Sequence, residues 1–166
     1  MELTKPAAHV EGSAFRIANV SRVQNPKAHA CLSMTATMME QCNEDRPEGL
    51  RYTEPTIVHR IYHGTDIDTA YKIAYNGFET PAKYGICGSI YGQFSLYHTG
   101  PGIFFRHHVI VSRGAVGRII ETPWDACMPA ADADIGGSES SRTATIYTFF
   151  NGFELEPLYL LEIEFD

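Results

Sequence analysis

The sequence predicts a single α+β domain. Its 166 residues suffice for one core of ordinary size, and 44% of them are hydrophobic while 20% are charged, a balance typical of globular proteins. Two segments repeat apolar residues at a helical period, whereas several others alternate apolar with polar residues or are rich in β-branched and aromatic ones. Residues 1–14 have no such pattern and are expected to form a flexible lead-in. The domain is therefore predicted to cover residues 15–166.

The first elements of the domain are predicted to be a strand and a long helix. Residues 15–20 alternate apolar with polar side chains, which favours a strand. Asn25 followed by Pro26 is typical of a helix start, and the helix is expected to run to Cys42. An amphipathic helix buries one stripe, so its apolar residues are expected to fill the core; they are Ala30, Cys31, Met34, Met38 and Met39. Residues 43–55 are rich in charge, proline and glycine and are expected to form a loop.

A strand followed directly by a helix is predicted next. Residues 56–62 are β-branched and aromatic, which indicates a buried strand, and they lead into His63-Gly64-Thr65. Asp66 is a suitable N-cap, and Gly77 is a suitable left-handed stop. Between them the apolar residues at helical spacing are Ile67, Ala70, Tyr71 and Ala74. This pattern places His63 at the end of a strand, beside the start of a helix, where binding groups often lie.

The remainder is predicted to be rich in strands and loops. Residues 81–102 hold many glycines and aromatic residues and indicate a loop-rich wall. Residues 123–142 are acidic and small and indicate a long loop. Strands are predicted for 102–113, 116–121, 143–150 and 158–165, with an Asn151-Gly152 turn joining the last two.

Composition excludes several classes of function. The chain has 13 Lys and Arg against 20 Asp and Glu, a net charge of −7, so a nucleic-acid partner is disfavoured. Apolar runs are far shorter than the roughly 20 residues of a membrane span, and the first twenty residues lack the apolar core of a secretory signal. The expectation is an intracellular protein, cytoplasmic or nuclear. The four cysteines form no Cys-x-x-Cys pair and are expected to be free thiols.

Few candidate catalytic or metal-binding motifs remain in the sequence. The adjacent His107 and His108 point to opposite faces of a strand, so the histidine spacing predicts no metal site. Nucleophile elbows and phosphate-binding glycine loops are absent from the sequence. His63-Gly64-Thr65 is thus the leading candidate for a site. On its own, a histidine at a strand end also fits a purely structural hydrogen bonder.

Several segments resemble, in the same order, the catalytic domain of poly(ADP-ribose) polymerase-like ADP-ribosyltransferases. The most specific match is Ile61-Tyr62-His63-Gly64-Thr65 followed by Tyr75-Asn76-Gly77-Phe78, which resembles the NAD-binding segment of that family. Further matches are the opening Val20–Asn25, the elements Tyr84–Tyr91 and Phe94-Ser95-Leu96-Tyr97, and the later core strands at Phe104–Val111 and Pro157–Leu161.

The resemblance implies a fold and a set of roles. The fold would have two small mixed or antiparallel sheets that form an NAD cleft, with flanking helices. His63 would hydrogen-bond a ribose, Gly64 would present its backbone donor and acceptor to the nicotinamide carboxamide, and Ser95 would add a hydroxyl. Tyr91 or Tyr97 would stack on the nicotinamide ring, His63 and Tyr91 being the catalytic pair. NAD would be the substrate, and the remaining cofactor-binding positions would be Thr65 and Tyr84.

The sequence departs from the family pattern at the third catalytic position. Polymer-forming members have a glutamate there, whereas this chain has Thr145 or Ile146. Filling the gap with Glu139, Glu154 or Glu156 would need an unusual register. At the second position, Ser89 competes with Tyr91, because Gly88–Tyr91 has one residue more than the family's motif.

Three functions therefore stay open. The leading expectation is a mono-ADP-ribosyltransferase that moves one ADP-ribose from NAD to a protein side chain and releases nicotinamide. The alternative is a pseudoenzyme of the same fold that acts as a binding or protein-interaction module. In the third, the chain is an unrelated α+β protein in which His63 is structural.

Overall fold

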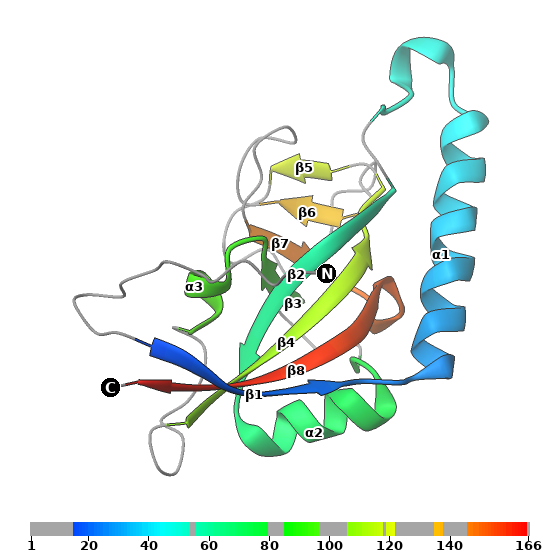
Figure 1. Cartoon of the computed structure of the whole chain (residues 1–166). Helices are drawn as coiled ribbons and strands as arrows, with labels where there is room; N and C mark the ends of the chain where they lie inside the picture. The colour runs from blue at the N-terminus through cyan, green and yellow to red at the C-terminus, as the bar shows by residue number, and fades with distance from the viewer. Residues whose placement is uncertain are drawn as a thin grey trace.

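A computed structural model describes residues 15–53, 56–79, 85–96, 106–117, 119–121, 135–137 and 146–165. These residues form an α+β domain, as the sequence predicts (Figure 1). The helices are α1 (Pro26–Glu44), η1 (Glu48–Leu50), α2 (Ile67–Asn76), α3 (Gly92–Leu96) and η3 (Gly152–Glu154). The strands are β1 (Phe15–Arg22), β2 (Ile57–Thr65), β3 (Ile86–Ser89), β4 (Arg106–Ala115), β5 (Ile119–Glu121), β6 (Ile135–Gly137), β7 (Ile146–Phe149) and β8 (Leu155–Phe165).

The expectation of two small sheets is wrong for the described strands. They form one eight-stranded sheet in the order β1-β8-β4-β2-β3-β7-β6-β5. Neighbours pair antiparallel except β5 and β6, which are parallel. The sheet is continuous because Tyr62 of β2 pairs with Ser89 of β3, the one register pair recorded between these two strands. This single pair joins two groups of four strands that are otherwise separate.

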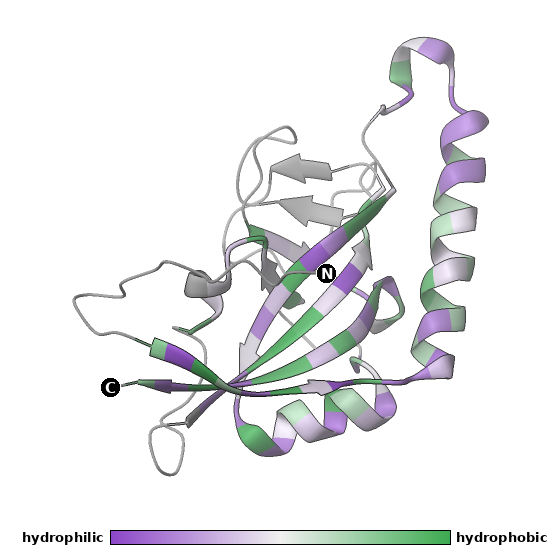
Figure 2. Cartoon of the chain, viewed as in Figure 1, coloured by the Kyte–Doolittle hydropathy of each residue, from purple (hydrophilic) through white to green (hydrophobic). Residues whose placement is uncertain are grey.

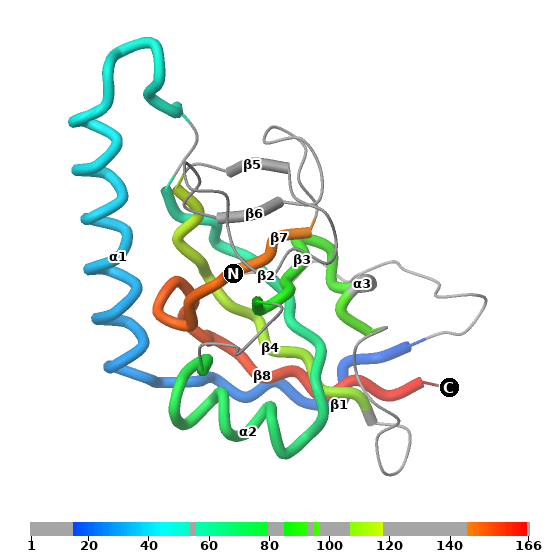
Figure 3. Tube along the Cα trace, turned by 180° about the vertical axis from the view of Figure 1, so that it is seen from behind, coloured from blue at the N-terminus to red at the C-terminus, as the bar shows by residue number. Residues whose placement is uncertain are grey.

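Each face of the sheet has its own core. On one face α2 covers a large cluster that includes Ile61, Ile110 and Phe149, all almost fully buried. On the other face, Leu96 of α3 packs with Val109 and Ile163. Figure 2 shows the hydrophobic residues running through the middle of β4 and β8, while Figure 3 shows α2 beneath the same strands from behind. Burial on both faces accounts for the apolar residues in the middle of these two strands, such as Val109, Ile110 and Leu160.

The helix α1 turns a different stripe to the sheet than its methionines predict. Met34 and Met38 are 65% and 59% exposed, so the expectation that they fill the core is wrong. The buried residues of α1 are Ala28, Leu32 and Ala36, also at helical spacing. Two alanines let the helix backbone approach the sheet closely. Periodicity alone does not distinguish the two stripes, because both repeat every four residues.

The expected caps at Asn25 and Asp66 and the stop at Gly77 are confirmed, while α1 runs to Glu44, two residues beyond the expected Cys42. The Asn25 side chain accepts a hydrogen bond from the Ala28 amide at 3.0 Å, and Asp66 accepts one from the Thr69 amide at 2.9 Å. The bonds to Thr69 lower the pKa of the Asp66 carboxyl. Gly77 ends α2 with a φ of +83°, where a side chain would be strained. Within α2, Ala70 and Ile73 are buried.

The end of the chain differs from the predicted hairpin. The strands β7 and β8 are not neighbours, and between them Asn151 and Glu154 cap the short helix η3 with a reciprocal pair of hydrogen bonds. Gly152 lies so close to Phe78 that an added Cβ would come within 2.0 Å of the Phe78 carbonyl oxygen. This close packing against the segment after α2 directs the chain across the domain, and β8 begins at Leu155.

Two regions predicted as loops contain regular structure. Residues 81–102 include β3 and α3, and 123–142 include β6. The predicted strand 116–121 is regular only at β5, while 102–105 and 143–145 lie outside the described residues. These elements are three to five residues long, too short for a clear period. The three strands among them form because neighbouring strands offer hydrogen-bonding edges.

A buried ion pair connects the central strands to α1. Arg113 of β4 donates from Nε to Glu156 of β8, a residue only 8% exposed. The His29 Nδ1 of α1 lies 3.2 Å from the other oxygen of the same carboxylate. A carboxylate at this depth depends on its partners, because removing one leaves a charge without compensation.

We therefore expect Arg113→Met to lower the free energy of unfolding by about 3 kcal/mol. The matched control is Arg16→Met, which removes the exposed Arg16–Glu164 pair and should cost less than about 1 kcal/mol. Urea denaturation of both variants measures the difference. Equal losses would contradict this assignment of the Glu156 environment.

Candidate functional site

The junction between β2 and β3 is the unusual part of the sheet. Residues Ile61 to Thr65 of β2 stay paired with β4, and all four residues of β3 stay paired with β7. Between β2 and β3, however, the recorded pairing is limited to Tyr62 and Ser89. Register pairing between the two strands therefore stops at Tyr62. We call the unpaired stretch beyond it, in which Gly64 is buried, the β2–β3 split.

The His63 ring lies in the β2–β3 split. Its Nδ1 is 2.8 Å from the Cys87 carbonyl oxygen. If the register of Tyr62 with Ser89 continued, Gly64 would lie opposite Cys87 and its amide would bind that carbonyl. The imidazole takes the place of this rung. Because a carbonyl only accepts, Nδ1 is the donor.

Phe78 holds the same ring from a second side. Its ring stands edge-on to the imidazole, with centroids 5.4 Å apart and an interplanar angle of 80°. Phe78 is 7% exposed and belongs to the large core cluster. The orientation of His63 is thus fixed by a backbone carbonyl and by a core aromatic residue.

The backbone edge of Gly64 faces the split. The Tyr62 carbonyl oxygen lies on the β3 side, since an added Cβ at Gly88 would be 3.7 Å from it. In a strand the peptide groups of alternate residues point to the same side, so the N–H and C=O of Gly64 point toward β3 as well. No residue of β3 is paired with Gly64 among the described residues. The split therefore holds an adjacent peptide donor and acceptor.

Ser95 of α3 reaches this edge from a segment about thirty residues away. Its hydroxyl donates to the Tyr62 carbonyl at 2.7 Å, and the residue is 3% exposed. The predicted approach of the strand ending at Tyr62 to the segment around Phe94 is confirmed by this bond. The structure thus places Ser95 against Tyr62, next to His63 and Gly64 in the chain, but on the face of the sheet opposite the His63 ring.

Ser89 and Tyr91 differ in depth. Ser89 is 4% exposed and stands opposite Tyr62 on one side and Ile146 on the other, so these three side chains share one face of the sheet. Tyr91 follows at the turn into α3, where its amide donates to the Ser89 hydroxyl at 3.0 Å and its side chain is 49% exposed. Ser89 therefore holds the position in register with Ile146.

The other predicted site residues are less informative. Thr65 is 9% exposed at the end of β2 and pairs with His108. Tyr84 and Tyr97 lie outside the described residues, as do Thr145 and Glu139.

Neither described candidate glutamate contacts the split. Glu154 is 7% exposed, and its carboxylate accepts from the Asn151 amide in the η3 cap. Glu156 binds Arg113. The position opposite Ser89 is the half-buried Ile146, which has no acidic group. The residue in register with Ser89 is therefore apolar, while Thr145, the other expected occupant of the third catalytic position, lies outside the described residues.

Sequence reasoning did not identify the roles of Cys87 and Phe78. Cys87 contributes its main-chain carbonyl, a group that every residue has, so no sequence signal could reveal it. Burial raises the pKa of the Cys87 thiol, which keeps the thiol neutral and poorly nucleophilic near neutral pH. Phe78 is part of the Tyr75–Phe78 segment, but its contact with His63 depends on the packing of α2.

Comparisons with known proteins do not assign the chain. No family model matches it, and the search of curated proteins gives no match. Within the described part of the chain, no helix is long and apolar enough to cross a membrane, and no group of three or more His, Cys, Asp or Glu is placed to hold a metal ion.

The hydrogen bond to Cys87 predicts the tautomer of His63. We expect Nδ1 to be protonated in the neutral ring, whereas His59, exposed on the same strand, should show the mixture typical of solvated imidazoles. Long-range ¹H–¹⁵N correlation spectra of the histidine rings measure this directly. A neutral His63 ring that carries its proton on Nε2 would contradict the hydrogen bond from Nδ1 to the Cys87 carbonyl.

Proposed function

We propose that this chain is a mono-ADP-ribosyltransferase domain that binds NAD at the β2–β3 split and transfers one ADP-ribose to a protein side chain. The observation that supports this most is the buried peptide edge of Gly64, which has no ladder partner in β3 and adjoins His63 and the Tyr62 carbonyl that binds Ser95. A primary amide needs one acceptor for its N–H groups and one donor for its carbonyl. The C=O and N–H of Gly64 supply that pair, and the nicotinamide carboxamide is an amide of this kind.

The neighbouring side chains suit the rest of the proposed ligand. The Ser95 hydroxyl donates to Tyr62 but keeps lone pairs that can accept from the second amide N–H. With Nδ1 of His63 bound to Cys87, Nε2 is the nitrogen that we assign to a ribose hydroxyl. The exposed Tyr91 ring, or Tyr97, would stack on the nicotinamide.

The proposed reaction breaks the bond between ribose C1′ and the nicotinamide nitrogen. The electron pair of that bond moves onto the ring nitrogen, which converts the pyridinium to neutral nicotinamide and leaves an oxocarbenium-like ribose. An acceptor carboxylate then forms the new bond to C1′ and needs no base, because it is already deprotonated at neutral pH. The substrate thus supplies the anion that Ile146 does not.

A specific observation favours the second candidate, a binding module of the same fold without transfer. His63 Nδ1 and the Ser95 hydroxyl both bond to backbone carbonyls within the domain, which is what structural roles require. Under this function the split binds an amide-bearing ligand or protein segment. NAD would then be bound without release of nicotinamide.

The decisive experiment is a pair of titrations, one with NAD and one with nicotinamide. Binding in each is measured by ligand-observed NMR. We expect binding of both ligands, loss of at least about tenfold in affinity in Ser95→Ala and His63→Ala, and no change in Ser33→Ala, an exposed hydroxyl on α1. Chromatography of the NAD sample should show released nicotinamide. Binding without release supports the binding module.

A lowered melting temperature in His63→Ala, together with no NAD binding by the parent, would overturn both candidates. In that case His63 is structural in an unrelated α+β domain.

The apolar side chain of Ile146 predicts that the product is a single ADP-ribose and not a polymer. Incubation with labelled NAD should give one ADP-ribose per modified site, because no carboxylate at Ile146 activates an attached ribose hydroxyl for elongation. Ile146→Glu should raise NAD hydrolysis, since it places an acid on the face shared with Ser89; Ile146→Gln is the matched control. Intact-mass spectrometry that shows polymer on the parent protein would contradict this prediction.

A further inference from the structure

The outer edge of β1 is open. β1 is the terminal strand of the sheet order, with β8 on one side and no described strand on the other. The Val23 amide donates to the Leu158 carbonyl at 2.8 Å, toward β8. Since peptide groups alternate in direction, Arg22 and Val20 direct their N–H and C=O away from β8. No described residue binds these groups, and Val20 is 41% exposed.

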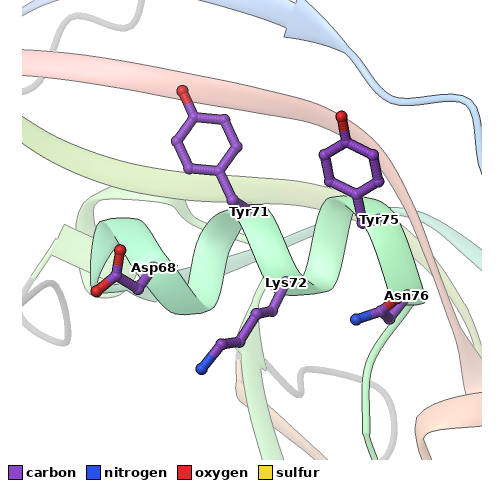
Figure 4. Close-up of a pocket in the computed structure, with 5 residues that line it drawn as sticks. All are labelled: Asp68, Tyr71, Lys72, Tyr75 and Asn76. Atoms are coloured by element: carbon purple, nitrogen blue, oxygen red, sulfur yellow. The ribbon is translucent and has the colours of Figure 1, made fainter.

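A hollow adjoins this edge. It has a volume of about 240 Å³ and lies between the end of β1 and α2, over Leu160. Tyr71 and Tyr75 form its wall on α2, and both rings project from the helix in the same direction (Figure 4). Tyr75 is 84% exposed and Tyr71 is 46% exposed. Two exposed tyrosines one helical turn apart offer an aromatic surface that no described residue covers.

A positive charge lies on the edge strand beside the hollow. Arg22 is the one charged residue in the lining of the hollow, but its register with Tyr159 places its side chain on the face opposite that of Ser21 and Leu160. Within the described part of the chain, Arg22 makes no ion pair. The overall charge of the chain is −7, so this guanidinium stands out as a local site for a carboxylate.

We propose that the outer edge of β1 and this hollow form a docking site for an extended peptide segment of another protein. The segment would add to β1 as a further strand, bonding the peptide groups of Val20 and Arg22. Every second side chain would point to the α2 face. The segment would carry an aromatic residue, which packs against Tyr71 and Tyr75 on the α2 face, and a neighbouring acidic residue, which points to the opposite face and pairs with Arg22.

An extended peptide fits these observations together. The open N–H and C=O groups select a backbone in strand conformation, while the hollow and the arginine select side chains, as in other strand-addition sites. The inference goes beyond the proposed function, because β1 lies three strands away from β2 in the sheet order. The experiment that tests this inference measures peptide binding alone, and its result does not depend on whether the chain binds NAD.

The probe is a fluorescein-labelled peptide of sequence Thr-Val-Glu-Phe-Glu-Val-Thr-Lys, in which Phe and the two Glu point to opposite faces of the strand. Its binding to the full chain is measured by fluorescence anisotropy. We expect Tyr75→Ala and Arg22→Glu each to weaken binding by at least about tenfold. The matched controls Phe153→Ala and Lys27→Glu, which change an exposed aromatic and an exposed cation elsewhere, should leave it unchanged. Peptides with Phe or both Glu replaced by Lys should bind at least about tenfold more weakly.

Backbone recognition is tested separately. Val20→Pro removes an outward N–H without removing a rung to β8, as edge strands tolerate, and should abolish binding while the circular dichroism spectrum is retained. Two peptides with N-methyl groups on alternate residues complete the test, since one set of amides faces β1 and the other faces solvent. One methylated peptide should lose binding and the other should keep it.

The proposal is overturned if the peptide does not bind, if both methylated peptides bind as the parent does, or if Tyr75→Ala and Arg22→Glu have no effect. Sedimentation that shows a dimer of the chain, lost in Val20→Pro, would also overturn it, because a second copy would then occupy the edge.

Discussion

The replacement of one rung of the sheet by an imidazole is the constraint on which the candidate site depends. The ladder between β2 and β3 begins at Tyr62 and Ser89 and would continue through Gly64 and Cys87. His63 intercepts the Cys87 carbonyl instead. The buried peptide groups of Gly64 are thereby left without a ladder partner in β3, at a place where the core on one face and α3 on the other hold the strands in position.

The Gly64 peptide groups stay unpaired because tight packing fixes the positions of the strands around them. Gly88 packs so tightly on Ile61 that an added Cβ would come within 2.4 Å of the Ile61 side chain, and Gly114 meets Ile61 at a similar distance. Such contacts fix the separation of β2, β3 and β4 near the site. Phe78 and Ser95 then hold the two ends of the Tyr62–His63 peptide from opposite faces of the sheet. A site of this kind, built on strands, keeps its donors and acceptors in fixed directions.

The same sheet gives its two ends different chemical character. At the β2–β3 split, the N–H and C=O of Gly64 have no ladder partner in β3 and lie among neutral side chains. Such surroundings suit an uncharged amide. At β1, backbone groups face outward beside exposed tyrosines and an arginine, which suits a longer acidic segment. In both places the recognition groups are peptide N–H and C=O that the ladder does not use.

The sequence by itself determined the α+β class, the caps at Asn25 and Asp66 and the stop at Gly77, because each depends on local backbone chemistry. It also predicted a strand at residues 56–62, which in the structure continues through His63 to Thr65. The choice of Gly64 and Ser95 beside His63 came from the family resemblance, and their roles stay predictions. Only the tertiary structure decided which helical stripe is buried, since the stripe of Met34 and Met38 repeats at the same spacing as that of Leu32 and Ala36. The role of the Cys87 carbonyl and the single-pair junction likewise depend on strand register, which is set by partners far apart in the chain.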